Sequence, residues 1–299
     1  MHIAVSIPTN TGADDPVALT DLAVLAEDLE FESIWTSEHM MHVSYVHARL
    51  GDRPYFHPLA ALSHMAARTS RIRLGTSILV LPFHHPFELA KYVATLDHFS
   101  AGRITLGVGV GNVEEEFDAM NVPWRERGSI TTESIKVMQA LWTQELASFE
   151  GKHWNFSGVR TSPKPVQEHS IPIWVGGNSE AAMRRAARLG SGWHPSAIGP
   201  KEFDESRLKA VEVLEEHGRD VSDFAFCVRL NVAVGESVTT EGERKAFVDG
   251  NDPRELAREL EAYQEAGVTH CILAPNSTDL EATAATLRSI GRDVLPSFR

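Results

Sequence analysis

Two kinds of apolar pattern alternate along the chain. Short, nearly continuous apolar runs predict buried strands, and the segments between them carry apolar residues at helical spacing. We expect strands at His2–Pro8, Ser33–Thr36, the first part of Arg71–Pro86, Arg103–Gly109, Ile171–Val175, Gly192–His194, Phe224–Val234 and His270–Ala274. We expect helices that begin near Pro16 and Pro58, and others at Phe87–Phe99, Gly128–Trp142, Glu180–Leu189, Phe203–His217, Pro253–Ala266 and Asp279–Ile290.

This alternation predicts the fold. Eight strand–helix pairs with nearly continuous apolar strands are typical of a (β/α)8 TIM barrel, an α/β fold. Ser148–Pro165 breaks the alternation with aromatic residues, glycine and proline, and predicts a β-hairpin excursion after the fourth strand–helix unit. No linker divides the chain, so we expect one domain over residues 1–299. A doubly wound sheet is the alternative, but no G-x-G-x-x-G motif follows the first strand.

The third strand contains an unusual interruption. Gly75-Thr76-Ser77 stands where an ordinary strand would continue to pack side chains, and the neighbouring strand GRITLGVGVGN is glycine-rich at its far end. Glycine inside a strand often marks a bulge or a close approach of a ligand to the backbone. Two neighbouring parallel strands with glycines near their carboxyl ends therefore predict a flat ligand, a cofactor, on this part of the sheet.

Composition and charge exclude several classes of protein. The formal net charge of -13, without an offsetting run of Lys and Arg, argues against a nucleic-acid partner. Cys227 and Cys271 lie in apolar, strand-like runs and are expected to be buried reduced thiols. The amino terminus enters a strand at once, and no apolar run is long enough to cross a membrane. We therefore expect a cytoplasmic protein without a membrane partner.

Candidate chemistry gathers at the expected carboxyl ends of the strands, where barrel enzymes place their active sites. Glu38-His39 follows the second strand, and a carboxylate beside an imidazole can set its charge and tautomer for proton transfer. The same two residues are also consistent with a structural role, in which Glu38 makes a hydrogen bond within the fold and His39 lies in a solvated loop. Gly176-Gly177-Asn178-Ser179 precedes a helix and suits phosphate binding, although a tight turn with Ser179 as N-cap is equally consistent.

The many histidines do not predict a metal site. The chain has fourteen of them, but it has no H-E-x-x-H, no C-x-x-C pair and no H-x-H at the end of the first strand. We expect no metal.

Several long stretches together resemble the bacterial luciferase-like superfamily, in particular its coenzyme F420-dependent oxidoreductases. They are SIWTSEH, RIRLGTSILVLPFHHP, LDHFSAGRITLGVGVGN, the excursion GKHWNFSG and IPIWVGGNSEAAMRRAARLGSGW. These stretches run in order from the second strand to the sixth, and the barrel pattern covers the remainder.

The resemblance implies roles for particular residues. It implies a non-prolyl cis peptide at Ser77–Ile78, in a bulge of the third strand that backs a tricyclic ring. It places the acidic–His pair Glu38-His39 beside the reactive edge of the ring, with His39 moving a proton and Glu38 orienting it. Asn112 and the segment Gly176-Gly177-Asn178-Ser179 match parts that line the ring and hold the phosphate.

Two positions narrow the choice of cofactor. Family members that use FMN place an arginine against the phosphate where this chain has Val110. The resemblance therefore implies coenzyme F420, a deazaflavin that transfers hydride, with FMN as the alternative. The related sugar-phosphate dehydrogenases place a glutamate where Asn112 stands, which argues against glucose 6-phosphate as the substrate.

The expected function is hydride transfer between F420 and a small organic substrate. A reduced-FMN monooxygenase that oxygenates an alkanal, alkane or sulfonate is the alternative. A barrel that binds cofactor without turnover and a metal-dependent hydrolase are more distant possibilities. Substrate determinants are expected in Met40–Phe56, in Glu114–Arg127 and in the connection after Val234. The family resemblance also implies a homodimer.

Overall fold

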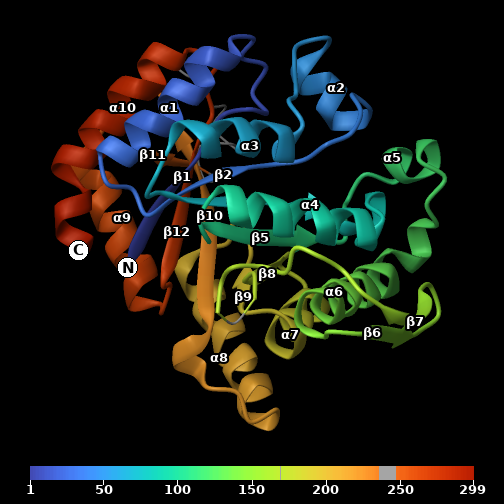
Figure 1. Ribbon diagram of the computed structural model, residues 1–299. Helices are drawn as coiled ribbons and strands as arrows, with labels where there is room; N and C mark the ends of the chain where they lie inside the picture. Colours follow the sequence, from blue (N-terminus) through green and yellow to red (C-terminus); the bar gives the residue numbers. More distant parts are fainter. Residues whose placement is uncertain (169, 236–246) are drawn as a thin grey trace.

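A closed barrel of parallel strands forms the centre of the computed structural model, which describes residues 1–168, 170–235 and 247–299 (Figure 1). The connection after Val234, expected to help select the substrate, falls on residues 236–246 and lies outside the described residues. The barrel strands are β1 (His2–Ser6), β2 (Ser33–Thr36), β3 (Arg73–Thr76), β4 (Leu79–Val80), β5 (Ile104–Gly109), β8 (Ile173–Gly176), β9 (Gly192–His194), β10 (Ala225–Ala233) and β12 (His270–Pro275).

The pairing pattern closes the sheet on itself. Strand β12 pairs with both β1 and β10, and β10 pairs in turn with β9, so the last strands meet the first. All these pairings are parallel, and helices surround the strands (Figure 1). The predicted (β/α)8 barrel is confirmed. An additional parallel strand that the sequence pattern did not predict, β11 (Phe247–Asp249), pairs with the last residues of β10.

The third barrel position is shared by two short strands. Both β3 and β4 pair with β5, and the peptide bond between Ser77 and Ile78, which separates them, is cis. The expected cis bond is therefore confirmed. The glycine before it has a different role from the one expected. A Cβ at Gly75 would overlap the indole ring of Trp35, so Gly75 makes room for a core side chain and not for a ligand.

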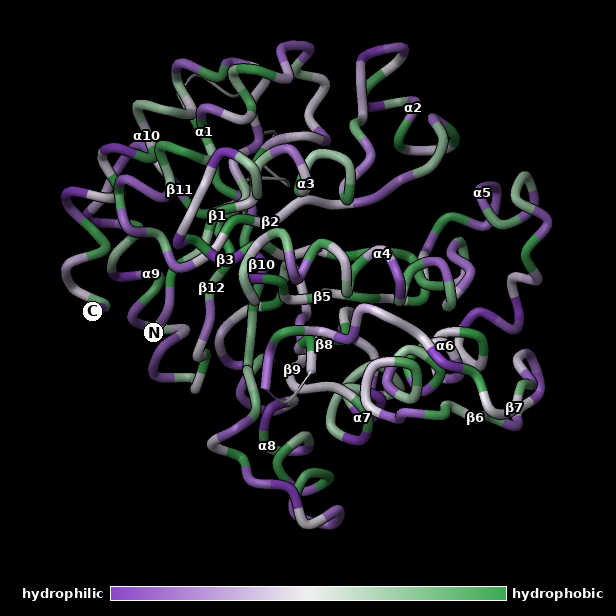
Figure 2. The backbone as a smooth tube through the Cα atoms, viewed as in Figure 1, coloured by the Kyte–Doolittle hydropathy of each residue, from purple (hydrophilic) through white to green (hydrophobic). Residues whose placement is uncertain are grey.

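The helices form the outer layer. They are α1 (Pro16–Asp28), α3 (Pro58–Arg68), α4 (Pro86–Phe99), α6 (Arg127–Thr143), α7 (Glu180–Leu189), α8 (Pro200–Glu216), α9 (Pro253–Glu265) and α10 (Leu280–Asp293). Side-chain caps begin several of them: Asp15, Asp252 and Asp279 each accept hydrogen bonds from first-turn amides. Figure 2 shows that hydrophobic residues concentrate on the strands and on the sides of the helices that face them.

Two more features complete the chain. The predicted excursion is an antiparallel hairpin of β6 (Ala147–Glu150) and β7 (Asn155–Val159), which lies beside α6 (Figure 1). Short helices α2 (Ser44–Leu50) and α5 (Glu114–Ala119) occur in segments that the sequence pattern left irregular. Only Val46 and Leu50 of α2 are buried, one turn apart, which is too short an apolar stripe to stand out from a polar segment. Among the described residues, no helix has the length and apolar character needed to cross a bilayer.

One partly buried carboxylate connects an outer helix to the start of the third strand. Glu27 on α1 accepts hydrogen bonds from the backbone amides of residues 70–72, at distances of 2.7 to 3.2 Å. Partial burial opposes the ionisation of Glu27, but these amides lower its pKa to about 2.

The Glu27→Gln variant is expected to lose about 1–2 kcal/mol of unfolding free energy at pH 7, because the charged acceptor is removed. A lowered carboxylate pKa stabilises the folded state above the unfolded pKa, near 4.3, and this contribution is lost as the pH falls toward 2. The difference from wild type should therefore be constant above about pH 5 and shrink below it. Urea unfolding at a series of pH values measures this. The exposed neighbour Asp28→Asn serves as the control, and an equal loss at pH 3 and pH 7 would contradict the assignment.

Candidate active site

A cavity of about 460 Å³ opens at the carboxyl ends of the barrel strands. Every barrel position contributes to its wall, as expected for an active site on this fold. The lining residues include Asn10, Ser37, Glu38, His39, Tyr45, Arg49, Tyr55, Ser77, Ile78, Val80, Gly109, Val110, Asn112, Gly176, Gly177, His194, Ser196, Arg229 and Asn231. Of the residues expected at the site, seven therefore lie around one cavity: Glu38, His39, Ser77, Ile78, Asn112, Gly176 and Gly177.

Ile78 forms the floor of the cavity together with two glycines of the neighbouring strands. A Cβ at Gly109 would overlap the Cδ1 atom of Ile78, and a Cβ at Gly176 would lie 2.8 Å from its Cγ2 atom. Contacts this short do not occur in folded proteins, so a side chain at either position would displace the Ile78 side chain from this place. The result is a smooth apolar surface without projecting side chains on its two sides. A flat ring system fits against such a surface.

His39 is held by a residue that the sequence reasoning did not single out. Its Nδ1 atom lies 2.8 Å from Oε2 of Glu116, on α5. The other oxygen of Glu116 accepts the backbone amides of Met40 and Met41, at 2.7 and 3.1 Å. Burial opposes ionisation of Glu116, but the hydrogen bonds from His39 and from these amides keep its pKa below the usual value. Glu116 is therefore an anion that fixes the orientation of the imidazole.

The carboxylate also selects the tautomer of His39. An ionised Glu116 can only accept, so Nδ1 carries a proton, and in the neutral ring Nε2 is free to accept one. The hydroxyl of Tyr45 lies 2.7 Å from this Nε2 atom. His39 is thus a partly exposed base at the cavity wall. Glu116 holds its Nδ1 atom, and Tyr45 on α2 contacts its Nε2 atom.

The expected pairing of Glu38 with His39 is wrong. Glu38 accepts the backbone amide of Val80 at 2.7 Å, and its oxygens lie 2.9 and 3.1 Å from Nε2 of His84. The side chains of successive residues in extended chain point in opposite directions, so Glu38 and His39 leave the end of β2 on different sides. Glu38 therefore connects the end of β2 to the last residue of β4 and to the segment that follows it. It still contributes to the cavity wall.

The segment expected to hold phosphate is only partly at the cavity. Gly176 and Gly177 line it, whereas Asn178 and Ser179 are not among the lining residues. Asn178 exchanges two hydrogen bonds with the backbone of Ser196, at 2.8 and 3.1 Å. Ser179 caps α7 by accepting the amide of Ala182 at 3.2 Å. The first amides of α7 have no intrahelical acceptor and remain a place where an anion can bind.

The two arginines near the start of α7 are engaged elsewhere. Arg184 forms an ion pair with Glu180 at 2.7 Å. Arg185 donates to Thr132 and to the carbonyl of Gly128, both on α6, at 3.0 and 3.2 Å. Neither guanidinium is among the cavity-lining groups.

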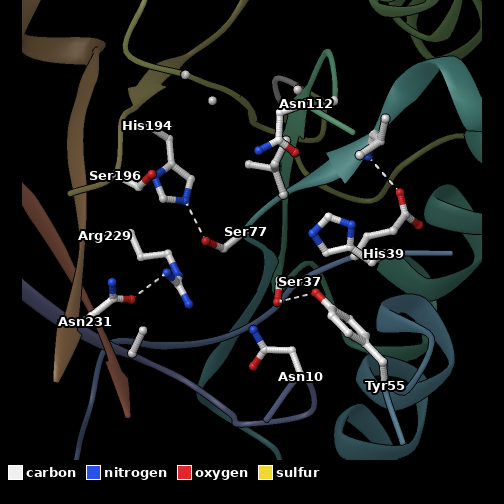
Figure 3. A pocket seen from close by; sticks show the side chains of 18 of the residues that line it. Asn10, Ser37, His39, Tyr55, Ser77, Asn112, His194, Ser196, Arg229 and Asn231 are labelled. Carbon is white, nitrogen blue, oxygen red and sulfur yellow. Dashed lines mark hydrogen bonds between the residues drawn. The ribbon is translucent and has the colours of Figure 1, made fainter. Parts of the chain in front are cut away.

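Figure 3 shows further polar side chains that the sequence analysis did not assign to the site, on the opposite side of the cavity from His39. Nε2 of His194 lies 2.9 Å from the hydroxyl of Ser77. Burial and then the charge of Arg229 lower the pKa of His194 to about 3, so its imidazole is neutral at physiological pH. Nη1 of Arg229 donates to Oδ1 of Asn231 at 3.0 Å. A charged residue inside the apolar run FAFCVRLNVAV was the available signal for Arg229.

The described residues contain no group of three or more His, Cys, Asp or Glu side chains placed to hold a metal ion.

Comparison with known proteins agrees with this geometry. Residues 1–248 match the family model for luciferase-like monooxygenases. An F420-dependent glucose-6-phosphate dehydrogenase of Kineococcus radiotolerans is 28% identical over 326 residues, covering 95% of this chain and 94% of the relative. The protein of the same name from Nakamurella multipartita is 32% identical over 266 residues, covering 85% of this chain and 72% of the relative.

Solved structures share the fold. The monooxygenase RslO1 of Streptomyces bottropensis has a TM-score of 0.86 at 21% identity, with full coverage of both chains. An F420-dependent secondary alcohol dehydrogenase, solved with an F420–acetone adduct, has a TM-score of 0.85 at 19% identity and covers 100% of this chain and 99% of its own. Since the family model matches most of the sequence and the barrel is the same, this chain belongs to the luciferase-like monooxygenase family.

Proposed function

We propose that this protein is an F420-dependent oxidoreductase that transfers a hydride between the deazaflavin ring and a small organic substrate. The observation that carries the proposal is the flat floor at Ile78, in the same cavity as a histidine whose base nitrogen is oriented by a buried carboxylate. A tricyclic ring on this floor would present one face to the cavity. His39 and Tyr45 would then lie beside the reacting atoms.

The residues present fit such a cofactor. The glycines at 109 and 176 leave the surface beside Ile78 free of projecting side chains. Gly177 and the first amides of α7 are suited to an anionic phosphate group. We assign ring contacts to Ser77, Ile78, Asn112 and Gly176, and the phosphate end to Gly177 and the start of α7, including Asn178 and Ser179.

Three observations favour F420 over FMN. The wall of the cavity carries Val110, which offers no charge to a terminal phosphate, and both arginines of α7 are bonded elsewhere. The phosphate of F420 is a diester and carries less charge than the monoester of FMN, so backbone amides suit it better. The relatives from Kineococcus radiotolerans and Nakamurella multipartita are named as F420-dependent enzymes.

The protein contributes orientation and a proton path. Bound F420 supplies the carbon that accepts or donates the hydride. His39 would take the proton of a substrate hydroxyl at Nε2, or return it in the reverse direction, while Glu116 stabilises the imidazolium that forms. The Tyr45 hydroxyl, 2.7 Å from Nε2, would pass this proton onward. Burial raises the pKa of Tyr45, so it stays a neutral donor near pH 7.

Cofactor titration tests the proposal. Purified protein should bind F420 with a dissociation constant in the micromolar range or below and bind FMN at least about tenfold more weakly, because neither Val110 nor the arginines of α7 offer a free guanidinium to a phosphate monoester. Quenching of cofactor fluorescence measures both constants. Tight FMN binding without F420 binding, together with oxygen uptake in the presence of reduced FMN, would instead support the monooxygenase.

We also propose that the chain acts as one domain and as a homodimer in the cytoplasm. Size-exclusion chromatography with light scattering tests the oligomeric state, and a mass of one chain at micromolar concentration would overturn the dimer.

A further inference from the structure

We propose that Arg229 and Asn231 form an anion subsite for a carboxylate of the substrate, separate from the phosphate end of the cofactor. This inference rests on the proposed function and goes further by naming a substrate class. It is argued from the bonding of Arg229, from the charge balance of the cavity and from the position of Arg229 opposite His39.

Arg229 lies in the cavity wall with part of its guanidinium unbonded. It extends from β10, and Nη1 donates to Asn231 at 3.0 Å. Its Nε atom is buried and has no hydrogen-bond partner among the described residues. Figure 3 shows the guanidinium pointing into the cavity between Ser77 and Asn10. A buried N–H group of a charged side chain is costly to leave unpaired, which points to an acceptor that is supplied by a ligand.

The surrounding protein does not neutralise this charge. No carboxylate of the described residues forms an ion pair with Arg229, and Glu38, the one acidic side chain among the cavity-lining residues, is bonded to Val80 and His84. A second guanidinium, from Arg49 on α2, also lines the cavity, and within the part of the chain that the structure describes it donates only to the carbonyl of Asn10, at 3.1 Å. His194 is neutral. Among the lining residues, the two guanidiniums therefore outnumber the one carboxylate, in a chain whose net charge is -13.

The free edge of the guanidinium suits a planar anion. With Nη1 bonded to Asn231, the edge formed by Nε and Nη2 remains, and its two parallel N–H groups match the two oxygens of a carboxylate. Figure 3 shows Arg229 and His39 on opposite sides of the cavity. A substrate that spans the cavity would place a carboxylate at Arg229 and a hydroxyl or carbonyl carbon near His39. Hydroxy acids and oxo acids meet both requirements.

A matched pair of ligands isolates the charge. Butanoate and butanamide have nearly the same shape, and calorimetry measures their binding to the free protein and to the F420-loaded protein. Wild type should bind butanoate at least about tenfold more tightly than butanamide, in line with a charge-assisted pair that is shielded from water. This ratio should fall to near one in Arg229→Gln. It should be partly retained in Arg229→Lys, which keeps the charge but lacks the two parallel N–H groups of the guanidinium. Arg68→Gln, on the outer surface, removes the same charge and should leave the ratio unchanged.

The outcomes separate the possible sources of the anion. Retention of the tenfold ratio in Arg229→Gln would overturn the subsite. Loss of butanoate binding when F420 is present, or a weakening of F420 binding by Arg229→Gln of tenfold or more, would assign Arg229 to the cofactor and overturn the substrate role. Tighter Arg229-dependent binding of inorganic phosphate than of butanoate would overturn the carboxylate. If F420 does not bind wild type at all, the proposed function fails, whereas the measurement on the free protein still decides the subsite.

Discussion

Turnover of the His39→Asn variant is expected to fall by about 10²–10⁴-fold, the usual contribution of a positioned general acid or base. Asparagine keeps polarity and approximate size at the cavity wall but cannot carry the transferred proton. F420 binding should change by less than about twofold, because the floor at Ile78 is untouched. Steady-state rates with the F420 cofactor and fluorescence titration measure the two effects, and a rate close to that of wild type would remove His39 from the mechanism.

The Glu116→Gln variant tests how His39 is oriented. Glutamine keeps the shape of the side chain but removes the anion that receives the proton of Nδ1. We expect an intermediate loss of turnover, about 10-fold to 10²-fold, and a pH–rate profile whose base limb is displaced to lower pH, since the imidazolium is no longer stabilised by charge and His39 loses its proton more easily. The exposed neighbour Glu115→Gln is the matched control. A full rate with an unshifted profile would show that Glu116 has only a structural role.

The Gly107→Ala variant is expected to lose about 3 kcal/mol of unfolding free energy, at the upper end of overpacking effects. A Cβ at residue 107 would collide with the carbonyl oxygen of Thr76, a backbone atom that cannot turn aside. Thr76 also donates its hydroxyl to the carbonyl of Gly107 at 2.7 Å, so the two strands cannot separate without losing this bond. Urea unfolding measures the change in stability. Cofactor affinity should fall as well, because Ser77 and Ile78, which we assign to the ring, follow Thr76 directly in the chain.

Gly128→Ala provides the comparison for this substitution. Residue 128 lies in the first turn of α6, and the added methyl group would meet only the end of the flexible Arg185 side chain, at 3.3 Å. Alanine is also the better helix former, so this variant should be neutral or more stable by up to about 1 kcal/mol. Equal losses in the two variants would contradict the assignment of the Gly107 effect to a collision with the backbone.

Much of the fold could be predicted because it depends on local patterns. The helix at Glu180–Leu189 begins and ends at the predicted residues, since Ser179 caps its first turn and its apolar residues recur on one side. The hairpin after the fourth unit follows from aromatic residues between Gly and Pro. The short helix α2 was missed because the propensity of seven residues is weak until they pack over the cavity.

The residues of the site also divide into those that local patterns predicted and those that they did not. Strand ends are predictable from the hydrophobic pattern, and parallel closure brings those ends together, which is why His39, Asn112 and Gly176 share one cavity. The family resemblance gave the cis bond at Ser77–Ile78 and the luciferase-like relationship. Sequence adjacency was misleading for Glu38 and His39, because neighbours in extended chain point apart.

The sequence by itself therefore determined the barrel, the end of the barrel that carries the site and the histidine that faces it. Only the tertiary structure decided which groups complete that site. Glu116 follows His39 by 77 residues, and no periodicity links two positions so far apart. The unbonded edge of Arg229 depends on which side chains surround it after the barrel closes. Local preferences are encoded in short stretches of sequence, whereas partnership and charge balance are set by the folded arrangement of distant strands.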